Sequence, residues 1–197
     1  MMRSLLLVGL LLMCHCISAQ YKVGDWYLSP KISFADYSDK DDWSGYSISK
    51  VPPISMTLEY GLNQYLSTGV TLGFSHDKFT NDTLNSNVHR FSTLAFGGIG
   101  SFHFAGLIEK WSNYSVFLGD WDFYLNAGFL LELDRNSEEN VWDEERKVFK
   151  SSETSDLSFR IRPAIGVRYF LTDDFCMLVE VGRTNLGLVT TGLSWQF

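Results

Sequence analysis

The sequence predicts an all-β protein in which eight antiparallel strands form an up-and-down transmembrane β-barrel behind an N-terminal signal peptide. Three observations predict this fold: an apolar leader, apolar and polar residues that alternate at period two through the rest of the chain, and aromatic residues gathered at one end of the predicted strands. The 197 residues suit a single domain, and 16 basic against 23 acidic residues argue against binding to nucleic acid.

The leader has the pattern of a secretory signal peptide. Arg3 precedes an apolar run at residues 5–13, and a cleavage site follows Ala19. The run is too short for a membrane helix, which needs about 20 apolar residues. We therefore expect residues 1–19 to be a signal peptide and residues 20–197 to form the barrel. Only Cys176 lies outside the leader, so the mature chain can form no intramolecular disulfide.

The remaining sequence alternates at the period of half-exposed strands. At the first of them, Trp26, Leu28 and Ile32 share one side, and Ser29 and Lys31 share the other. The same pattern predicts eight strands, at residues 26–34, 54–60, 66–74, 89–104, 121–132, 157–170, 175–183 and 186–197.

The predicted connections alternate in character. The connections after strands two and six are short, and those after strands one, three and five are long and polar, at residues 37–50, 80–87 and 134–155. Residues 105–120 and the turn near Thr184 are exceptions to this rule. The charged 134–155 connection also carries Val141, Trp142 and Phe149, and we expect it to meet a surface partner.

The polar side of the strands carries charged residues that we expect to face the lumen. An eight-stranded barrel has an interior just wide enough to be filled by side chains, and buried charges there must be paired. No continuous aqueous pore is therefore expected. We expect Glu59, Glu132 and Glu180 to pair with the arginines of residues 157–170. If residues 172–174 form a three-residue turn, Glu180 faces Gly166, which leaves room for an arginine of this strand to reach it. The full predicted luminal charge network is Lys31, Glu59, Glu132, Arg160, Arg162, Arg168 and Glu180.

Aromatic residues decide which side faces outward. A soluble ligand-binding barrel has the same alternation but gains nothing from an exposed aromatic ring at one rim. A membrane barrel places such a girdle at headgroup depth. The predicted girdle is Trp26, Tyr60, Trp121, Phe123 and Tyr169.

The wall of a membrane barrel must close on itself. An unpaired strand edge in hydrocarbon costs several kcal/mol for each orphaned group, so we expect the first strand to pair with the last. The glycines Gly97, Gly98 and Gly100 are expected where side chains would crowd inside a tight curve.

The final segment ends on Phe197, with Trp195, Leu193 and Val189 at alternate positions before it. Together with the leader and the strand count, it resembles the outer-membrane β-barrel proteins of Gram-negative bacteria, in particular the small OmpA/OmpX-type barrels. The resemblance implies an outer-membrane location with both termini in the periplasm. It also implies that Trp195 and Phe197 are the signal read by the barrel assembly machinery. Outer-membrane lipid and lipopolysaccharide are implied partners, and the expected protein is a monomer without a cofactor.

The predicted function is a non-enzymatic structural or surface-interaction role through the extracellular loops. A lipid-modifying enzyme and a narrow channel stay open as alternatives. For an enzyme, the candidates are Ser75-His76-Asp77, His89 and His103. Because neighbours along a strand point to opposite faces, Ser75 and His76 do not meet easily, and His103 is expected inside the luminal network.

No metal site is predicted. The acidic cluster of the first long connection lacks the glycine and the closing glutamate of a calcium loop. Its members are Asp36, Asp39, Asp41 and Asp42.

Overall fold

The computed structural model describes residues 21–34, 46–81, 87–113, 118–143, 148–183 and 186–197. The predicted signal peptide, residues 1–19, lies outside this part of the chain. Within it, none of the helices has the length and apolar character required to cross a membrane.

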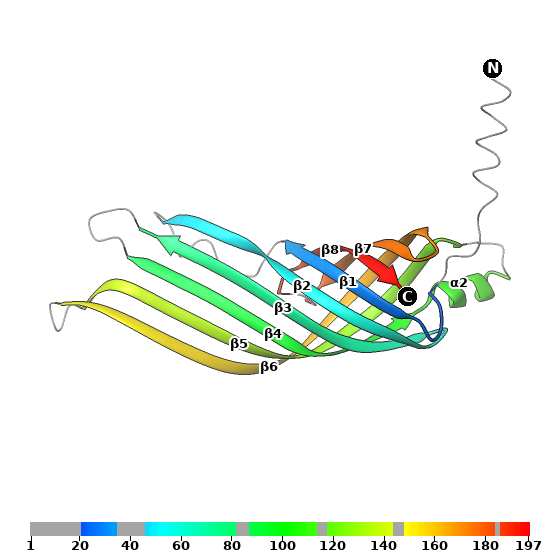
Figure 1. The fold of residues 1–197 in the computed structure, drawn as a ribbon, viewed down its shortest axis with the longest axis horizontal. Helices are drawn as coiled ribbons and strands as arrows, with labels where there is room; N and C mark the ends of the chain where they lie inside the picture. The colour runs from blue at the N-terminus through cyan, green and yellow to red at the C-terminus, as the bar shows by residue number, and fades with distance from the viewer. Residues whose placement is uncertain (1–20, 35–45, 82–86, 114–117, 144–147, 184–185) are drawn as a thin grey trace, which may run out of the picture.

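Eight antiparallel strands form a closed ring in chain order (Figure 1). They are β1 (Trp26–Phe34), β2 (Ser47–Asn63), β3 (Leu66–Thr80), β4 (Val88–His103), β5 (Trp121–Asp143), β6 (Val148–Thr172), β7 (Phe175–Gly182) and β8 (Val189–Gln196). The predicted fold class is thus confirmed.

The ring closes between its first and last strands, as expected. β1 pairs with β8, and Trp26 and Phe197 exchange two backbone hydrogen bonds, of 2.9 and 3.0 Å. A short helix that the sequence did not predict, α2 (Ala105–Trp111), follows β4 at the end of the barrel that holds the C-terminus (Figure 1).

The barrel is polar inside and apolar outside. On β6, the outward side chains of Ile161, Ile165 and Tyr169 are exposed, whereas Arg162 and Arg168 between them are buried. The other strands repeat this pattern. The alternation therefore has the sense expected of a barrel in lipid, because an exposed apolar wall needs an apolar solvent.

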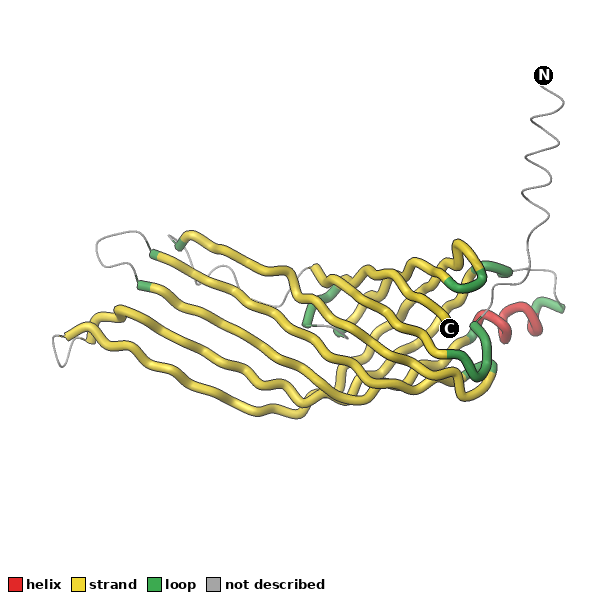
Figure 2. Tube along the Cα trace, viewed as in Figure 1, coloured by secondary structure: helices red, strands yellow, loops and turns green. Residues whose placement is uncertain are grey.

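The strands differ greatly in length. β5 and β6 have 23 and 25 residues, whereas β1, β7 and β8 have 8 or 9. β2 to β6 consequently continue past the ends of the short strands as an open sheet, which we call the extension (Figures 1 and 2). It consists of the parts of β2 to β6 that lie beyond the pairing with β1 and β7.

The extension corrects one prediction. Residues 134–155 were expected to be a loop, but β5 continues to Asp143 and β6 begins at Val148. The connection predicted at residues 37–50 is also shorter, since β2 begins at Ser47, whereas the one predicted at residues 80–87 lies between the end of β3 at Thr80 and the start of β4 at Val88. Where water covers both faces of a sheet, backbone pairing continues although the apolar alternation stops, so the sequence pattern carries no strand signal there.

The glycines of β4 differ in how closely their neighbours approach. A Cβ on Gly97 would lie 2.0 Å from the carbonyl oxygen of Phe129, whereas one on Gly98 would have its nearest neighbour at 3.9 Å. The expected crowding therefore applies to Gly97, where β4 and β5 approach closely.

Replacing Gly97 with alanine should destabilise the barrel by about 1–3 kcal/mol, because the new methyl group meets backbone that cannot move away. Gly98→Ala, one residue further along β4, is the matched control and should leave stability nearly unchanged. Urea unfolding in detergent measures both. Equal midpoints for the two variants would contradict this account of Gly97.

Candidate functional site

The lumen is organised around Arg168 of β6, which is fully buried. Its guanidinium forms an ion pair with Glu59 of β2 and lies over the rings of Tyr27 and Tyr124, 5.4 and 4.6 Å from their centroids. Ser101 also donates a hydrogen bond to Glu59, at 2.8 Å. A buried cation is thus held by a carboxylate and two aromatic faces.

A second buried pair lies on the other side of Tyr124. Lys31 of β1 donates to Glu180 of β7 at 2.7 Å, and the Tyr124 hydroxyl donates to the same carboxylate oxygen at 2.9 Å. Glu180 faces Gly166, as the sequence register predicted. The space above Gly166 was expected to admit an arginine, but the Tyr124 ring occupies it, 2.3 Å from where a Cβ would be.

A third pair lies nearer the extension. Arg162 binds both oxygens of Glu132, and Arg160 reaches Glu132 at 3.0 Å. The carboxylate of Glu132 is buried, but the Arg160 side chain is 56% exposed. The structure therefore brings all seven predicted network residues to the inner face, with Arg160 at its open end.

Apolar side chains complete the filling. Leu130 and Leu178 also point inward and are fully buried. Large apolar side chains are thus buried in the lumen together with the paired charges.

His103 of β4 joins a hydrogen-bonded chain that the sequence did not reveal. Its Nδ1 lies 2.8 Å from Asp122 of β5, and its Nε2 lies 3.0 Å from the hydroxyl of Ser67 on β3. All three side chains are buried. Their order is that of a serine, histidine and aspartate triad, and only the strand register could have indicated it.

The proton of Ser67 is directed away from His103, however. The Ser67 hydroxyl donates to Glu59 at 2.6 Å, so its oxygen can only accept from the ring. The Nε2 atom of His103 must then donate to Ser67, and its Nδ1 must donate to the carboxylate of Asp122, whereas a general base needs Nε2 free of a proton. The hydrogen-bond pattern therefore fits a structural relay better than an activated serine.

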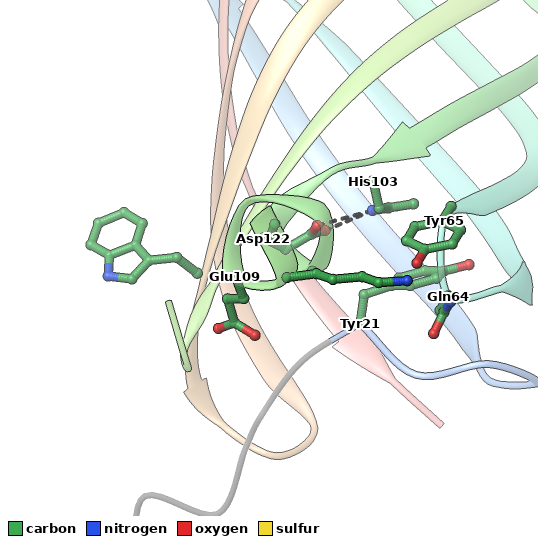
Figure 3. A pocket seen from close by; sticks show the side chains of 10 residues that line it. Tyr21, Gln64, Tyr65, His103, Glu109 and Asp122 are labelled. Atoms are coloured by element: carbon green, nitrogen blue, oxygen red, sulfur yellow. Dashed lines mark hydrogen bonds and ion pairs between the residues drawn. The ribbon is translucent and has the colours of Figure 1, made fainter. Parts of the chain in front are cut away.

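A pocket of about 320 Å³ opens beside this relay at the α2 end of the barrel (Figure 3). Asp122 and His103 line it, and Tyr21 stacks on the His103 ring with centroids 3.8 Å apart. Burial, reinforced by the charge of Glu59, raises the pKa of the Tyr21 hydroxyl above its ordinary value. Tyr21 therefore stays protonated and donates to the carbonyl of Leu66 at 3.1 Å.

The predicted aromatic girdle lies at the same end of the barrel. Trp26 contacts Tyr60 with centroids 4.9 Å apart, and Trp121 contacts Tyr169 at 4.7 Å and Phe123 at 6.3 Å. These rings belong to the outward face of the wall.

The sequence matches the family described as "Outer membrane protein beta-barrel domain" over residues 5–197. The chain belongs to this family. The outer membrane is accordingly its location. No curated protein matches the sequence.

A solved outer-membrane barrel shares the fold. Ail of Yersinia pestis, in complex with the heparin analogue sucrose octasulfate, aligns with a TM-score of 0.52 and 9% identity, over 89% of this chain and 100% of Ail. OprG of Pseudomonas aeruginosa aligns with a TM-score of 0.49 and 11% identity, over 91% and 98% of the two chains. At these identities the likeness to Ail concerns the fold alone.

Other predicted residues of this outer-membrane barrel lie apart from the relay. His76 of the Ser75-His76-Asp77 segment has its Nδ1 2.8 Å from the Ser92 hydroxyl, and His89 lies 3.6 Å from Glu138. The predicted assembly signal, Trp195 and Phe197, is exposed on the closing strand, and its role stays a prediction. The acidic cluster at residues 36–42 and the side chains of Val141, Trp142 and Phe149 lie outside the described part.

Replacing Glu180 with alanine should lower the free energy of unfolding by about 3–5 kcal/mol, because Lys31 would be left buried without its carboxylate. Glu153→Ala is the control, since its pair with Arg135 is half exposed and contributes less than about 1 kcal/mol. Urea unfolding in detergent distinguishes the two, and an unchanged midpoint for Glu180→Ala would count against the luminal network.

Proposed function

We propose that this outer-membrane barrel is a non-catalytic surface protein that presents the extension to an extracellular partner. The observation that carries the proposal is the free edge of β6. β7 stops pairing at Gly182, opposite Ala164, whereas β6 continues back to Val148. Within the described residues, no strand pairs with that side of β6 before Ala164.

Two hydrogen bonds within the closed barrel show to which side each residue of β6 directs its backbone N–H and C=O groups. The N–H of Phe170 donates to Asp120 on the β5 side, and the carbonyl of Pro163 accepts from Arg183 on the β7 side. Because neighbours along a strand alternate, odd-numbered residues of β6 direct their N–H and C=O groups to the free edge. Ser151, Glu153 and Ser155 are such residues, and all are exposed.

The opposite edge of the extension is protected. β2 carries Pro52 and Pro53 within an irregularity between Val51 and Ile54, and neither proline can donate a backbone hydrogen bond. Prolines and irregularities on an edge strand prevent unwanted pairing. The part of β6 from Val148 to Arg162 contains no proline. The asymmetry favours β6 as a binding edge for an extended peptide segment, in the manner of strand addition.

The buried side chains of the lumen argue against the narrow-channel alternative. Arg168, Tyr27, Tyr124, Leu130 and Leu178 are all fully buried in the closed barrel. Conduction would require these paired and packed side chains to separate, so the arrangement supports a closed barrel over a channel.

The proposal predicts that a strand-like peptide binds the free edge through its backbone. The probe is a labelled synthetic peptide that copies residues 134–141, which pair with β6 on its other side. Ser155→Pro removes one edge N–H and should weaken binding about tenfold, since a lost backbone hydrogen bond also leaves a partner unpaired. Fluorescence anisotropy with the full chain in nanodiscs measures the affinity.

Two controls isolate the backbone contribution. Ser155→Ala keeps the N–H and should bind like the unchanged protein, and a probe N-methylated at alternate residues should bind poorly. If the Pro and Ala variants bind equally, or if N-methylation has no effect, strand addition at β6 is wrong.

A second candidate, an enzyme, is favoured by the arrangement of Ser67, His103 and Asp122 beside the pocket. The hydrogen bond from Ser67 to Glu59 argues against it, as does the stacking of Tyr21 on His103. An activated serine reacts covalently with fluorophosphonates. We expect no labelling of Ser67 when the folded protein is treated with such a probe and examined by mass spectrometry. Labelling that Ser67→Ala abolishes would establish the enzyme instead.

A further inference from the structure

The wall of the barrel is low at β7, which has eight residues, as has β8. From Phe175 to Gly182, β7 advances seven residues, which corresponds to about 18 Å along the membrane normal at the usual rise and tilt. The apolar band of an outer-membrane barrel is about 25 Å tall. Beside β6, above the last pair of Ala164 and Gly182, the described wall therefore has a gap, which we call the notch.

Two arginines stand at the notch with one carboxylate between them. Arg160 and Arg162 both contact Glu132, which leaves this group with an excess positive charge. The Arg162 side chain is 11% exposed, but that of Arg160 is 56% exposed. Arg162 also donates to the carbonyl of Arg183, at the end of β7, at 3.3 Å. The Arg162 end of this cationic group is thus anchored to the backbone of Arg183, and the Arg160 end is open to solvent.

The depth of Arg160 matches that of lipid headgroups. It lies nine residues beyond Tyr169 of the girdle along β6, which corresponds to about 23 Å along the membrane normal. This places its guanidinium near the outer boundary of the apolar band. Leu157, Phe159 and Ile161 flank it on the outward face and are each about 60% exposed. An anionic head with attached acyl chains would meet arginine and apolar surface together.

The backbone adds donors at the same place. Phe159 and Ile161 are odd-numbered, so their N–H groups point to the edge of β6 that borders the notch. Unpaired N–H groups at membrane depth are costly, and a phosphate oxygen can accept from them and from a guanidinium at once.

We propose that the notch binds the phosphate group of an outer-leaflet lipid, with Arg160 as its principal ligand and the edge N–H groups of β6 as further donors. The acyl chains lie along Leu157, Phe159 and Ile161. The phosphorylated lipid that occupies this leaflet in Gram-negative bacteria is lipid A, and it is the occupant to which the proposal commits. The site does not depend on a protein partner of the extension.

The test compares lipids that differ only in phosphate. The full chain in detergent is titrated with lipid A that carries two phosphates, and with the same lipid after enzymatic dephosphorylation, and binding is followed by native mass spectrometry. The unchanged protein should bind the phosphorylated lipid about tenfold more tightly. Arg160→Gln should remove most of this preference. Arg135→Gln is the matched control, because Arg135 is equally exposed but lies elsewhere on the extension, paired with Glu153.

Each outcome is decisive. Equal binding of the two lipids to the unchanged protein overturns the site without any variant, so the test survives if Arg160→Gln does not fold. If Arg160→Gln and Arg135→Gln weaken the preference for the phosphorylated lipid equally, general surface charge accounts for that preference. This result would also overturn the assignment. Displacement of lipid A by an equal concentration of inorganic phosphate would assign the notch to free phosphate instead of a lipid.

Discussion

The closure of the sheet between β1 and β8 is the constraint on which the rest of the structure depends. Hydrocarbon offers no hydrogen bonds, so each backbone group at membrane depth needs a partner within the protein. The two backbone hydrogen bonds between Trp26 and Phe197 complete the ring at the girdle. Closure by only eight strands makes the lumen narrow, and the narrow lumen in turn determines what the inward side chains can do.

Those inward side chains form paired charges. Arg168 with Glu59 and Lys31 with Glu180 join strands that are distant in sequence, and Arg162 with Glu132 joins the consecutive strands β5 and β6. Removal of one partner would leave a buried charge, so the pairs tie the strands into a single register. The relay of Ser67, His103 and Asp122 belongs to the same polar interior, and its link to Glu59 explains why a triad-like geometry is better understood as structural.

The regions beyond closure carry the proposed interactions. Because β1, β7 and β8 are short, the remaining strands continue as the extension, and β6 is left with a free edge. Near its base this edge borders the notch with Arg160, at lipid depth. Further out it carries Ser151, Glu153 and Ser155 in water. One unequal set of strand lengths thus accounts for both the proposed lipid site and the proposed peptide-binding edge.

The sequence by itself determined the strand count, the outward apolar face and the inward charges of residues such as Glu59 and Arg168, because alternation at period two is imposed by the contrast between lipid and lumen. It also determined that Glu180 faces Gly166. It could not show that residues 134–143 and 148–155 are paired strands, because water on both faces removes that contrast. Only the tertiary structure decided which charges meet, that Tyr124 fills the space at Gly166, and that Ser67 reaches His103 and Glu59 across neighbouring strands. Those contacts depend on register and closure, which are properties of the whole ring and not of any one strand.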